Sequence, residues 1–206
     1  MKIAIIVGHS LTKPGAYGVD PLNCYEYEWY KPFAQELYRL ARGLNLQCHV
    51  FTRDGLTIEK VGEAVNKWAG DDNACAIELH WNSLNGNIQG TETWFDLEPP
   101  EGELLAKEVH NAMIGLFNRR DQKDQKKNKL DRGTKLLTDH DRGFKNAATV
   151  KIPYALIEPV FADNKIESKL LLDKRVPLAM SLISAAHKFL VNQSSSAQLS
   201  YTGTSI

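Results

Sequence analysis

Short apolar runs rich in β-branched residues alternate along this chain with longer segments whose apolar residues recur at helical spacing. Such runs are typical of buried strands, because a strand covered on both faces carries no polar alternation. They lie at 2–7, 47–52, 74–80, 90–95 and 154–158, and the amphipathic segments lie at 26–41, 58–68, 104–117 and 166–191. This order predicts an α/β fold in which helices cover both faces of a mostly parallel, twisted sheet.

The length and composition predict one domain with a short extension. A chain of 206 residues can bury one core, and its 25 basic residues balance 25 acidic ones, which gives no reason to expect a nucleic-acid partner. Residues 192–206 are rich in Ser and Thr and carry no charge, so we predict a domain over residues 1–191 followed by a flexible tail or linker. Residues 119–129 are polar without hydrophobic periodicity, which predicts a solvated loop.

The first apolar run, at residues 2–7, indicates whether the chain begins with a signal sequence or a membrane span. It is far shorter than a signal sequence or a membrane span, and Gly8 and His9 interrupt it. We therefore expect a chain made in the cytoplasm without a signal peptide and without stable membrane insertion. The odd number of cysteines, at Cys24, Cys48 and Cys75, and their irregular spacing predict unpaired thiols.

Three side chains that can bind a metal or move a proton stand at or just after the ends of predicted strands. His9 follows the first strand, His80 follows the run at 74–79, and Glu158 closes the last. Because ligands collect beyond the carboxyl ends of parallel strands, we expect these side chains to converge. Glu26, in the first turn of the helix after the first loop, can reach the same edge of the sheet.

Two imidazoles and one carboxylate are a common ligand set for a hydrolytic zinc ion, with a fourth position left for water. We therefore predict a Zn²⁺ ion held by His9, Glu26 and His80. Because zinc lowers the pKa of bound water to about 7, a nearby carboxylate can take the proton and pass it to a departing amine. Glu158 is the predicted carrier of that proton.

Other residues compete for these roles. Glu78 lies two residues before His80 on the same strand face, so it can support that histidine or act as a rival base. Glu28 is an alternative to Glu26, although it would misplace the apolar face of the helix. A lone histidine after a strand is more often structural than a ligand, and we interpret four in this way: His49, His110, His140 and His187.

Ordered motifs span nearly the whole chain. They are IAIIVGHS, EYEWYKPFAQEL, CHVFTRD, IELHWNS, GTETWF and IPYALIEPVFADN. Together they resemble the zinc-dependent N-acetylmuramoyl-L-alanine amidases of the amidase-3 type, with their phosphorylase/hydrolase-like fold, and especially the catalytic domains of bacteriophage endolysins. The resemblance implies that His9, Glu26 and His80 hold zinc, that Glu158 is catalytic, and that Glu26 rather than Glu28 is the ligand.

The sequence departs from the family pattern at two of these motifs. Trp81 follows His80 where a small residue is more usual, and Pro159 follows the catalytic Glu158. These departures bear on the shape of the substrate rather than on the chemistry.

The resemblance also implies a substrate, which is the bacterial peptidoglycan. The bond cut would be the amide between the lactyl group of N-acetylmuramic acid and the L-alanine of the stem peptide. Without a signal sequence, such an enzyme would serve phage-mediated host lysis and reach the wall through a holin-type pore. Candidate substrate contacts are Arg132, Arg142 and Lys151 for stem-peptide carboxylates, and Asn82 and Asn164 for hydrogen bonds.

Two other functions are compatible with the residues alone. A zinc peptidase acting within stem peptides would use the same ligand set, because the ligands do not distinguish one amide from another. A wall-binding domain that has kept the fold without catalysis is the second alternative, although all four functional positions carry competent residues.

Overall fold

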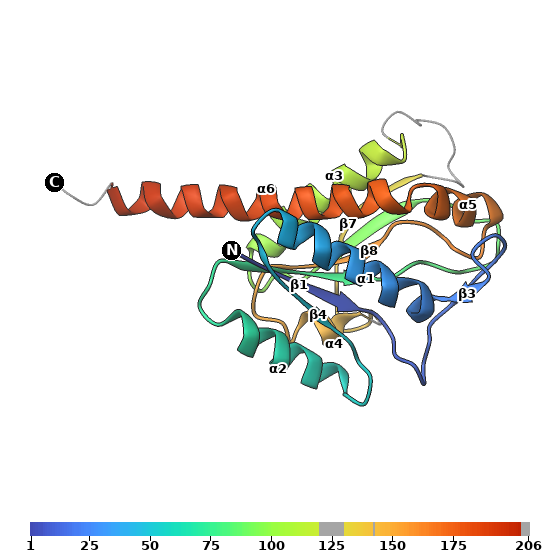
Figure 1. Ribbon diagram of the computed structural model, residues 1–206, viewed down its shortest axis with the longest axis horizontal. Helices are drawn as coiled ribbons and strands as arrows, with labels where there is room; N and C mark the ends of the chain where they lie inside the picture. The colour runs from blue at the N-terminus through green and yellow to red at the C-terminus, as the bar shows by residue number, and fades with distance from the viewer. Residues whose placement is uncertain (120–129, 142, 203–206) are drawn as a thin grey trace.

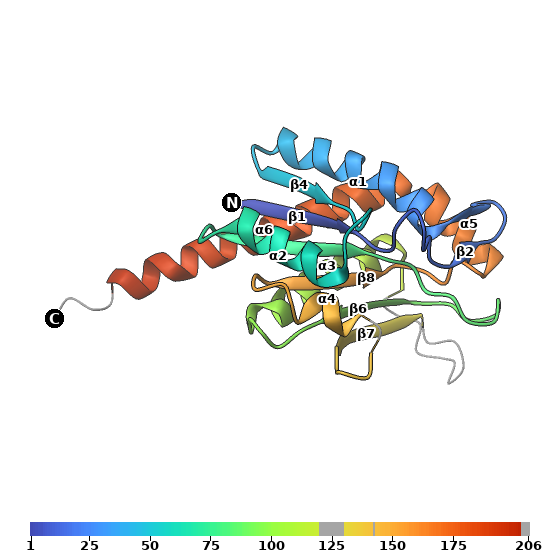
Figure 2. The ribbon, with the colours of Figure 1, turned by 90° about the horizontal axis from the view of Figure 1, so that it is seen from below.

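A six-stranded sheet forms the centre of the protein (Figures 1 and 2). The computed structural model describes residues 1–119, 130–141 and 143–202, with residues 196–202 described by their backbone alone. The strands lie side by side in the order β4 (Gln47–Phe51), β1 (Lys2–Val7), β5 (Ala74–Leu79), β8 (Tyr154–Glu158), β6 (Thr91–Phe95) and β7 (Asp131–Leu136).

The sheet is mixed but mostly parallel. Strands β4, β1, β5 and β8 run parallel, β6 pairs antiparallel with β8, and β7 pairs parallel with β6. The reversal of β6 brings its beginning, rather than its end, to the edge where the parallel strands finish, so Glu92 pairs with Glu158. The predicted α/β fold is confirmed, and β7 is an addition to it.

Helices cover the two faces of the sheet unequally. The larger apolar core lies under α1 (Glu26–Gly43), α3 (Glu101–Leu116), α5 (Lys165–Asp173) and α6 (Arg175–Thr202). The smaller core, on the opposite face, lies under α2 (Ile58–Ala69) and α4 (Phe144–Ala147). Because side chains alternate along a strand, Ile3 and Ile5 belong to the first core and Ala4 and Ile6 to the second.

A small two-stranded sheet, β2 (Tyr17–Gly18) with β3 (Cys24–Tyr25), interrupts the loop between β1 and α1. All three cysteines are free, as predicted, and burial raises the pKa of the Cys48 thiol to about 12. Among the described residues, no helix combines the length and the apolar character that crossing a membrane requires.

The predicted start of a tail at Asn192 falls inside α6, which continues as a helix to Thr202 and projects past the sheet (Figure 1). The segment contains neither Gly nor Pro before Gly203, so nothing in it breaks the helix. Asn73 also ties this part of α6 to the body, since its Nδ2 donates to Leu190 O at 2.9 Å and to Ser194 Oγ at 2.7 Å. The backbone is helical as far as Thr202, and the flexibility of this segment stays a prediction.

The predicted solvated loop over residues 119–129 is wrong for its first residue, because the side chain of Arg119 is buried. Its Nη2 lies 2.6 Å from Glu167 Oε1, both side chains are 2% exposed, and its Nη1 donates to Thr91 Oγ1 at 2.8 Å. The rest of that segment, residues 120–129, lies outside the described residues.

We expect Arg119→Ala to lower the free energy of unfolding by about 3–5 kcal/mol, because it leaves the Glu167 carboxylate buried without its partner. Urea denaturation followed by circular dichroism measures the change. Lys188→Ala is the control, since Lys188 pairs with Glu108 at the surface and such pairs contribute about 1 kcal/mol or less. Equal effects of the two substitutions would contradict the prediction.

Candidate active site

A cleft of about 580 Å³ opens at the edge of the sheet where β1, β5 and β8 end. It is lined by His9, Gly15, Ala16, Glu26, Arg53, His80, Trp81, Asn82, Ser83, Gly143, Asn146, Leu156 and Glu158. A hollow of about 500 Å³ between α3 and α6 is comparable in size, but its two ionisable groups, Glu108 and Lys188, pair with each other. The cleft, by contrast, gathers His9, Glu26, His80 and Glu158 from separate elements of the chain.

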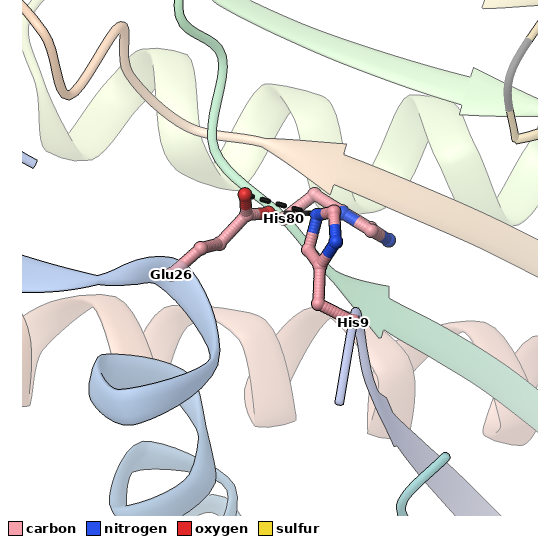
Figure 3. A group of neighbouring side chains, drawn as sticks. All are labelled: His9, Glu26 and His80. Atoms are coloured by element: carbon pink, nitrogen blue, oxygen red, sulfur yellow. Dashed lines mark hydrogen bonds and ion pairs between the residues drawn. The ribbon is translucent and has the colours of Figure 1, made fainter. Parts of the chain in front are cut away.

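The three predicted metal ligands lie together in this cleft (Figure 3). One ligand atom from each of His9, Glu26 and His80 lies within 4.8 Å of the others. The Glu26 carboxylate contacts both rings, with Oε2 at 3.0 Å from His9 Nε2 and Oε1 at 2.9 Å from His80 Nδ1. Two imidazole nitrogens and a carboxylate oxygen so arranged fit the donor set that zinc prefers.

The backbone around the ligands leaves room for their rings. A methyl group at Gly8 would lie 2.3 Å from His80 Cε1, and one at Gly15 would lie 2.6 Å from His9 Cδ2 and 2.7 Å from Glu26 Oε2. Gly15 also has a positive φ of +86°, which other residues rarely adopt. The two glycines therefore let the loop after β1 close against the ligands.

Hydrogen bonds hold His80 and Glu26 in place. The parallel ladder extends past the end of β5, because His80 N donates to Ile157 O at 3.1 Å, and Tyr30 Oη donates to His80 O at 2.6 Å. Trp81 N donates to Glu26 Oε1 at 3.0 Å. His80 and Glu26 are thus positioned by the sheet and by α1, whereas His9 lies in the loop after β1.

The charges of the cluster are strongly coupled. Burial by itself would raise the pKa of Glu26, but hydrogen bonds and charge from His80 and His9 lower that pKa to about 2. Burial would lower the pKa of His80, yet the carboxylates of Glu26 and Glu78 raise it to about 10. The two carboxylates thus favour the protonated form of His80, and binding a metal there requires release of a proton.

Glu158, the last residue of β8, lines the same cleft. Its Oε2 atom is buried and has no hydrogen-bond partner among the described residues. Burial, reinforced by the charges of Glu26 and Glu92, raises the pKa of Glu158 to about 8, although His80 and Lys135 oppose the shift. A carboxyl group that titrates near neutral pH can both accept and donate a proton.

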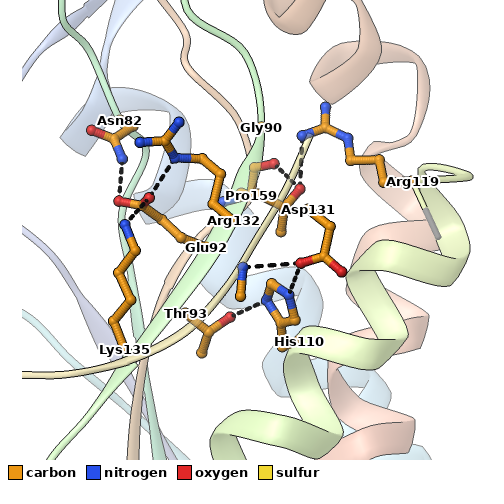
Figure 4. A network of polar contacts seen from close by, with 12 residues as sticks. Asn82, Gly90, Glu92, Thr93, His110, Arg119, Asp131, Arg132, Lys135 and Pro159 are labelled. Carbon is orange, nitrogen blue, oxygen red and sulfur yellow. Dashed lines mark hydrogen bonds and ion pairs between the residues drawn. The ribbon is translucent and has the colours of Figure 1, made fainter. Parts of the chain in front are cut away.

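Glu92 is a residue of this region that the sequence did not single out (Figure 4). It pairs across the sheet with Glu158 and accepts from Arg132 Nε at 2.7 Å, Lys135 Nζ at 2.6 Å and Asn82 Nδ2 at 2.7 Å. The cations hold the pKa of Glu92 below its ordinary value despite burial, which opposes them. Nε of Arg132, a candidate contact for stem-peptide carboxylates, is thus engaged with Glu92.

The structure separates the other predicted substrate contacts. Asn82 lines the cleft. Asn164 does not, since its Oδ1 caps α5 by accepting from Ile166 N at 3.0 Å. Lys151 is exposed and is not among the residues that line the cleft, and Arg142 lies outside the described residues.

The two competing carboxylates also take distinct places. Glu28 faces away from the cluster and accepts a hydrogen bond from Tyr25 N at 2.8 Å, as a residue that caps the start of α1 does. Glu78 is fully buried and lies against His80, with Oε1 at 2.8 Å from Nε2. Neither residue lines the cleft.

Comparison with known proteins agrees with this architecture. The N-acetylmuramoyl-L-alanine amidase family model matches residues 3–186, and no curated protein sequence matches the chain. The catalytic domain of the amidase CwlV from Paenibacillus polymyxa has a TM-score of 0.73 and 19% identity, with 92% of this chain and 98% of that chain covered. The amidase AmiC2 of Nostoc punctiforme has a TM-score of 0.73 and 16% identity, with 92% and 97% covered.

An endolysin is among the similar structures as well. The catalytic domain of the CD27L endolysin, which targets Clostridia difficile, has a TM-score of 0.69 and 23% identity, with 91% of this chain and 97% of that chain covered. These likenesses establish the fold, and the family match over residues 3–186 establishes the relationship. The chain belongs to the amidase-3 family of N-acetylmuramoyl-L-alanine amidases.

Proposed function

We propose that this amidase hydrolyses the bond between N-acetylmuramic acid and L-alanine in peptidoglycan with a Zn²⁺ ion held by His9, Glu26 and His80, and with Glu158 as the proton carrier. The observation that carries the proposal is the meeting of these four side chains in one cleft, with the three ligand atoms within 4.8 Å of one another. The family match over residues 3–186 supplies the bond and the substrate.

Zinc bound there supplies Lewis acidity, which polarises the scissile carbonyl and lowers the pKa of water. Glu158 accepts the proton of the attacking water and then donates it to the departing amine of L-alanine. Its buried Oε2 has no hydrogen-bond partner among the described residues and is free for this exchange, whereas the oxygens of Glu92 accept from Arg132, Lys135 and Asn82.

The test is a digest of purified peptidoglycan with zinc-loaded protein. The proposal predicts new amino termini that are L-alanine, without new reducing sugar ends. New termini found only inside the stem peptide would instead make the protein a peptidase. Binding to the wall without release of any product would make it a non-catalytic wall-binding domain.

We further propose a role in phage-mediated host lysis, in which the enzyme is made in the cytoplasm and reaches the wall through a holin-type pore. Support comes from the resemblance of its motifs to endolysin catalytic domains, although solved structures of similar fold include bacterial amidases as well as an endolysin. Expression in a susceptible host with and without a co-expressed holin tests the role. Lysis that needs the holin supports it, and equal lysis without the holin contradicts it.

A further inference from the structure

Glu78 is a carboxylate enclosed in the core directly beside a proposed metal ligand. Its side chain is 0% exposed, and it lies two residues before His80 on the same face of β5. Three groups converge on it: His80 Nε2 at 2.8 Å from Oε1, Tyr154 Oη at 2.6 Å from Oε2, and the amide of Asn146 on Oε1. An ionised carboxylate that is buried without partners is costly. The three groups around Glu78 offset that cost, which indicates that Glu78 is ionised in the folded protein.

The two nitrogens of His80 face different carboxylates. Nδ1 lies 2.9 Å from Oε1 of Glu26, which lines the cleft together with His9, while Nε2 lies 2.8 Å from Oε1 of Glu78, which is buried and does not line the cleft. An ionised carboxylate can only accept a hydrogen bond, so a proton on Nε2 is held by Glu78. The nitrogen left for a metal is then Nδ1.

We propose that Glu78 is a positioning residue of the metal site, which fixes His80 in the tautomer protonated on Nε2 and directs Nδ1 to the metal. The inference rests on the proposed zinc site. Carboxylates that accept the second ring proton of a metal-bound histidine orient the ring and strengthen it as a ligand. Asn146 and Tyr154 in turn hold the Glu78 carboxylate, so α4 and β8 both contribute to the orientation.

This role separates Glu78 from Glu158. Glu78 does not line the cleft, and both of its oxygens are occupied. Glu158 lines the cleft and has an oxygen without a partner among the described residues. Proton transfer to the substrate therefore belongs to Glu158, and the orientation of His80 belongs to Glu78.

The test measures zinc affinity by competition with a chromophoric chelator, independently of amidase activity. We expect Glu78→Gln to weaken zinc binding about 10–100-fold, with kcat largely recovered at saturating zinc. Glu167→Gln is the matched control, because it also neutralises a buried carboxylate, in the pair with Arg119. It should lower stability without changing zinc affinity. An unchanged zinc affinity in folded Glu78→Gln, or lost kcat despite full zinc occupancy, would overturn the proposal.

Two further measurements keep the proposal testable if Glu78→Gln does not fold. Tyr154→Phe removes one hydrogen bond to Glu78 without changing its charge, and it should weaken zinc binding by a smaller factor. Nitrogen-15 NMR of the histidine rings in the zinc-loaded wild type should show His80 protonated on Nε2, and protonation on Nδ1 would overturn the assignment. A wild type that binds no zinc at all would instead overturn the proposed function.

Discussion

Glu158→Gln is expected to lower kcat on peptidoglycan by about 10²–10⁴-fold, the usual contribution of general acid–base catalysis, while the zinc content of the protein stays the same. The amide has nearly the shape of the carboxyl group, but it cannot accept the proton of water or return one to the departing amine. Because Glu158 is not part of the His9, Glu26 and His80 cluster, the metal ligands remain in place.

Metal analysis and turnover of the same zinc-loaded sample measure this prediction. In the wild type, burial raises the pKa of Glu158 to about 8, and a nearby divalent cation favours the ionised form and lowers that pKa. Activity should therefore rise with pH through the pKa of Glu158, and Glu158→Gln should lack this rise. Glu108→Gln, at the exposed pair with Lys188, is the control. Loss of zinc from Glu158→Gln would make Glu158 a ligand instead.

Glu26→Gln should remove zinc and activity together. Glu26 is 1% exposed and bridges His9 and His80, so its carboxylate supplies both a donor atom and the negative charge of the cluster. Loss of a direct ligand should weaken zinc binding by more than about 100-fold, which is the upper end of the effect of residues that only hydrogen-bond to a ligand. Zinc retained after dialysis and the apparent affinity against a chelator measure the effect.

The matched control for that experiment lies on the same helix. Glu28→Gln changes a carboxylate two residues further along α1, but Glu28 is exposed and only caps the helix by accepting from Tyr25 N. It should keep zinc and activity, with at most a modest loss of stability. If Glu28→Gln lost zinc and Glu26→Gln retained it, the choice between the two carboxylates would be reversed.

The positions of His9, His80 and Glu158 could be predicted because each closes or follows a continuous apolar run. Strands that are covered on both faces carry such runs, and parallel strands bring their ends to one edge. The local sequence pattern therefore predicts both the strands and the convergence of their carboxyl ends. The same reasoning could not decide between Glu26 and Glu28 until the family motifs were considered, because both stand in the first turn of the predicted helix.

What the sequence did not reveal depends on long-range pairing. Strand β7 (DRGTKL) is a partly exposed edge strand, so it has no apolar run to mark it. Glu92 approaches Glu158 only because β6 runs antiparallel to β8. Arg119 belongs to a polar run, and its buried charge pairs with Glu167, a residue of α5 far along the chain. Nothing local to these residues indicates which partner they meet.

The cluster of His9, Glu26 and His80 connects the two layers of helices that lie on opposite faces of the sheet. Glu26 comes from α1 on one face, whereas Asn146 reaches Glu78 and hence His80 from α4 on the other. An ion bound by these ligands would link the two layers across the sheet. Because it binds only the folded protein, its binding would raise the free energy of unfolding of both layers. Zinc loading should consequently slow amide hydrogen exchange at the start of α1 and around α4 together, although these helices lie on opposite faces of the sheet.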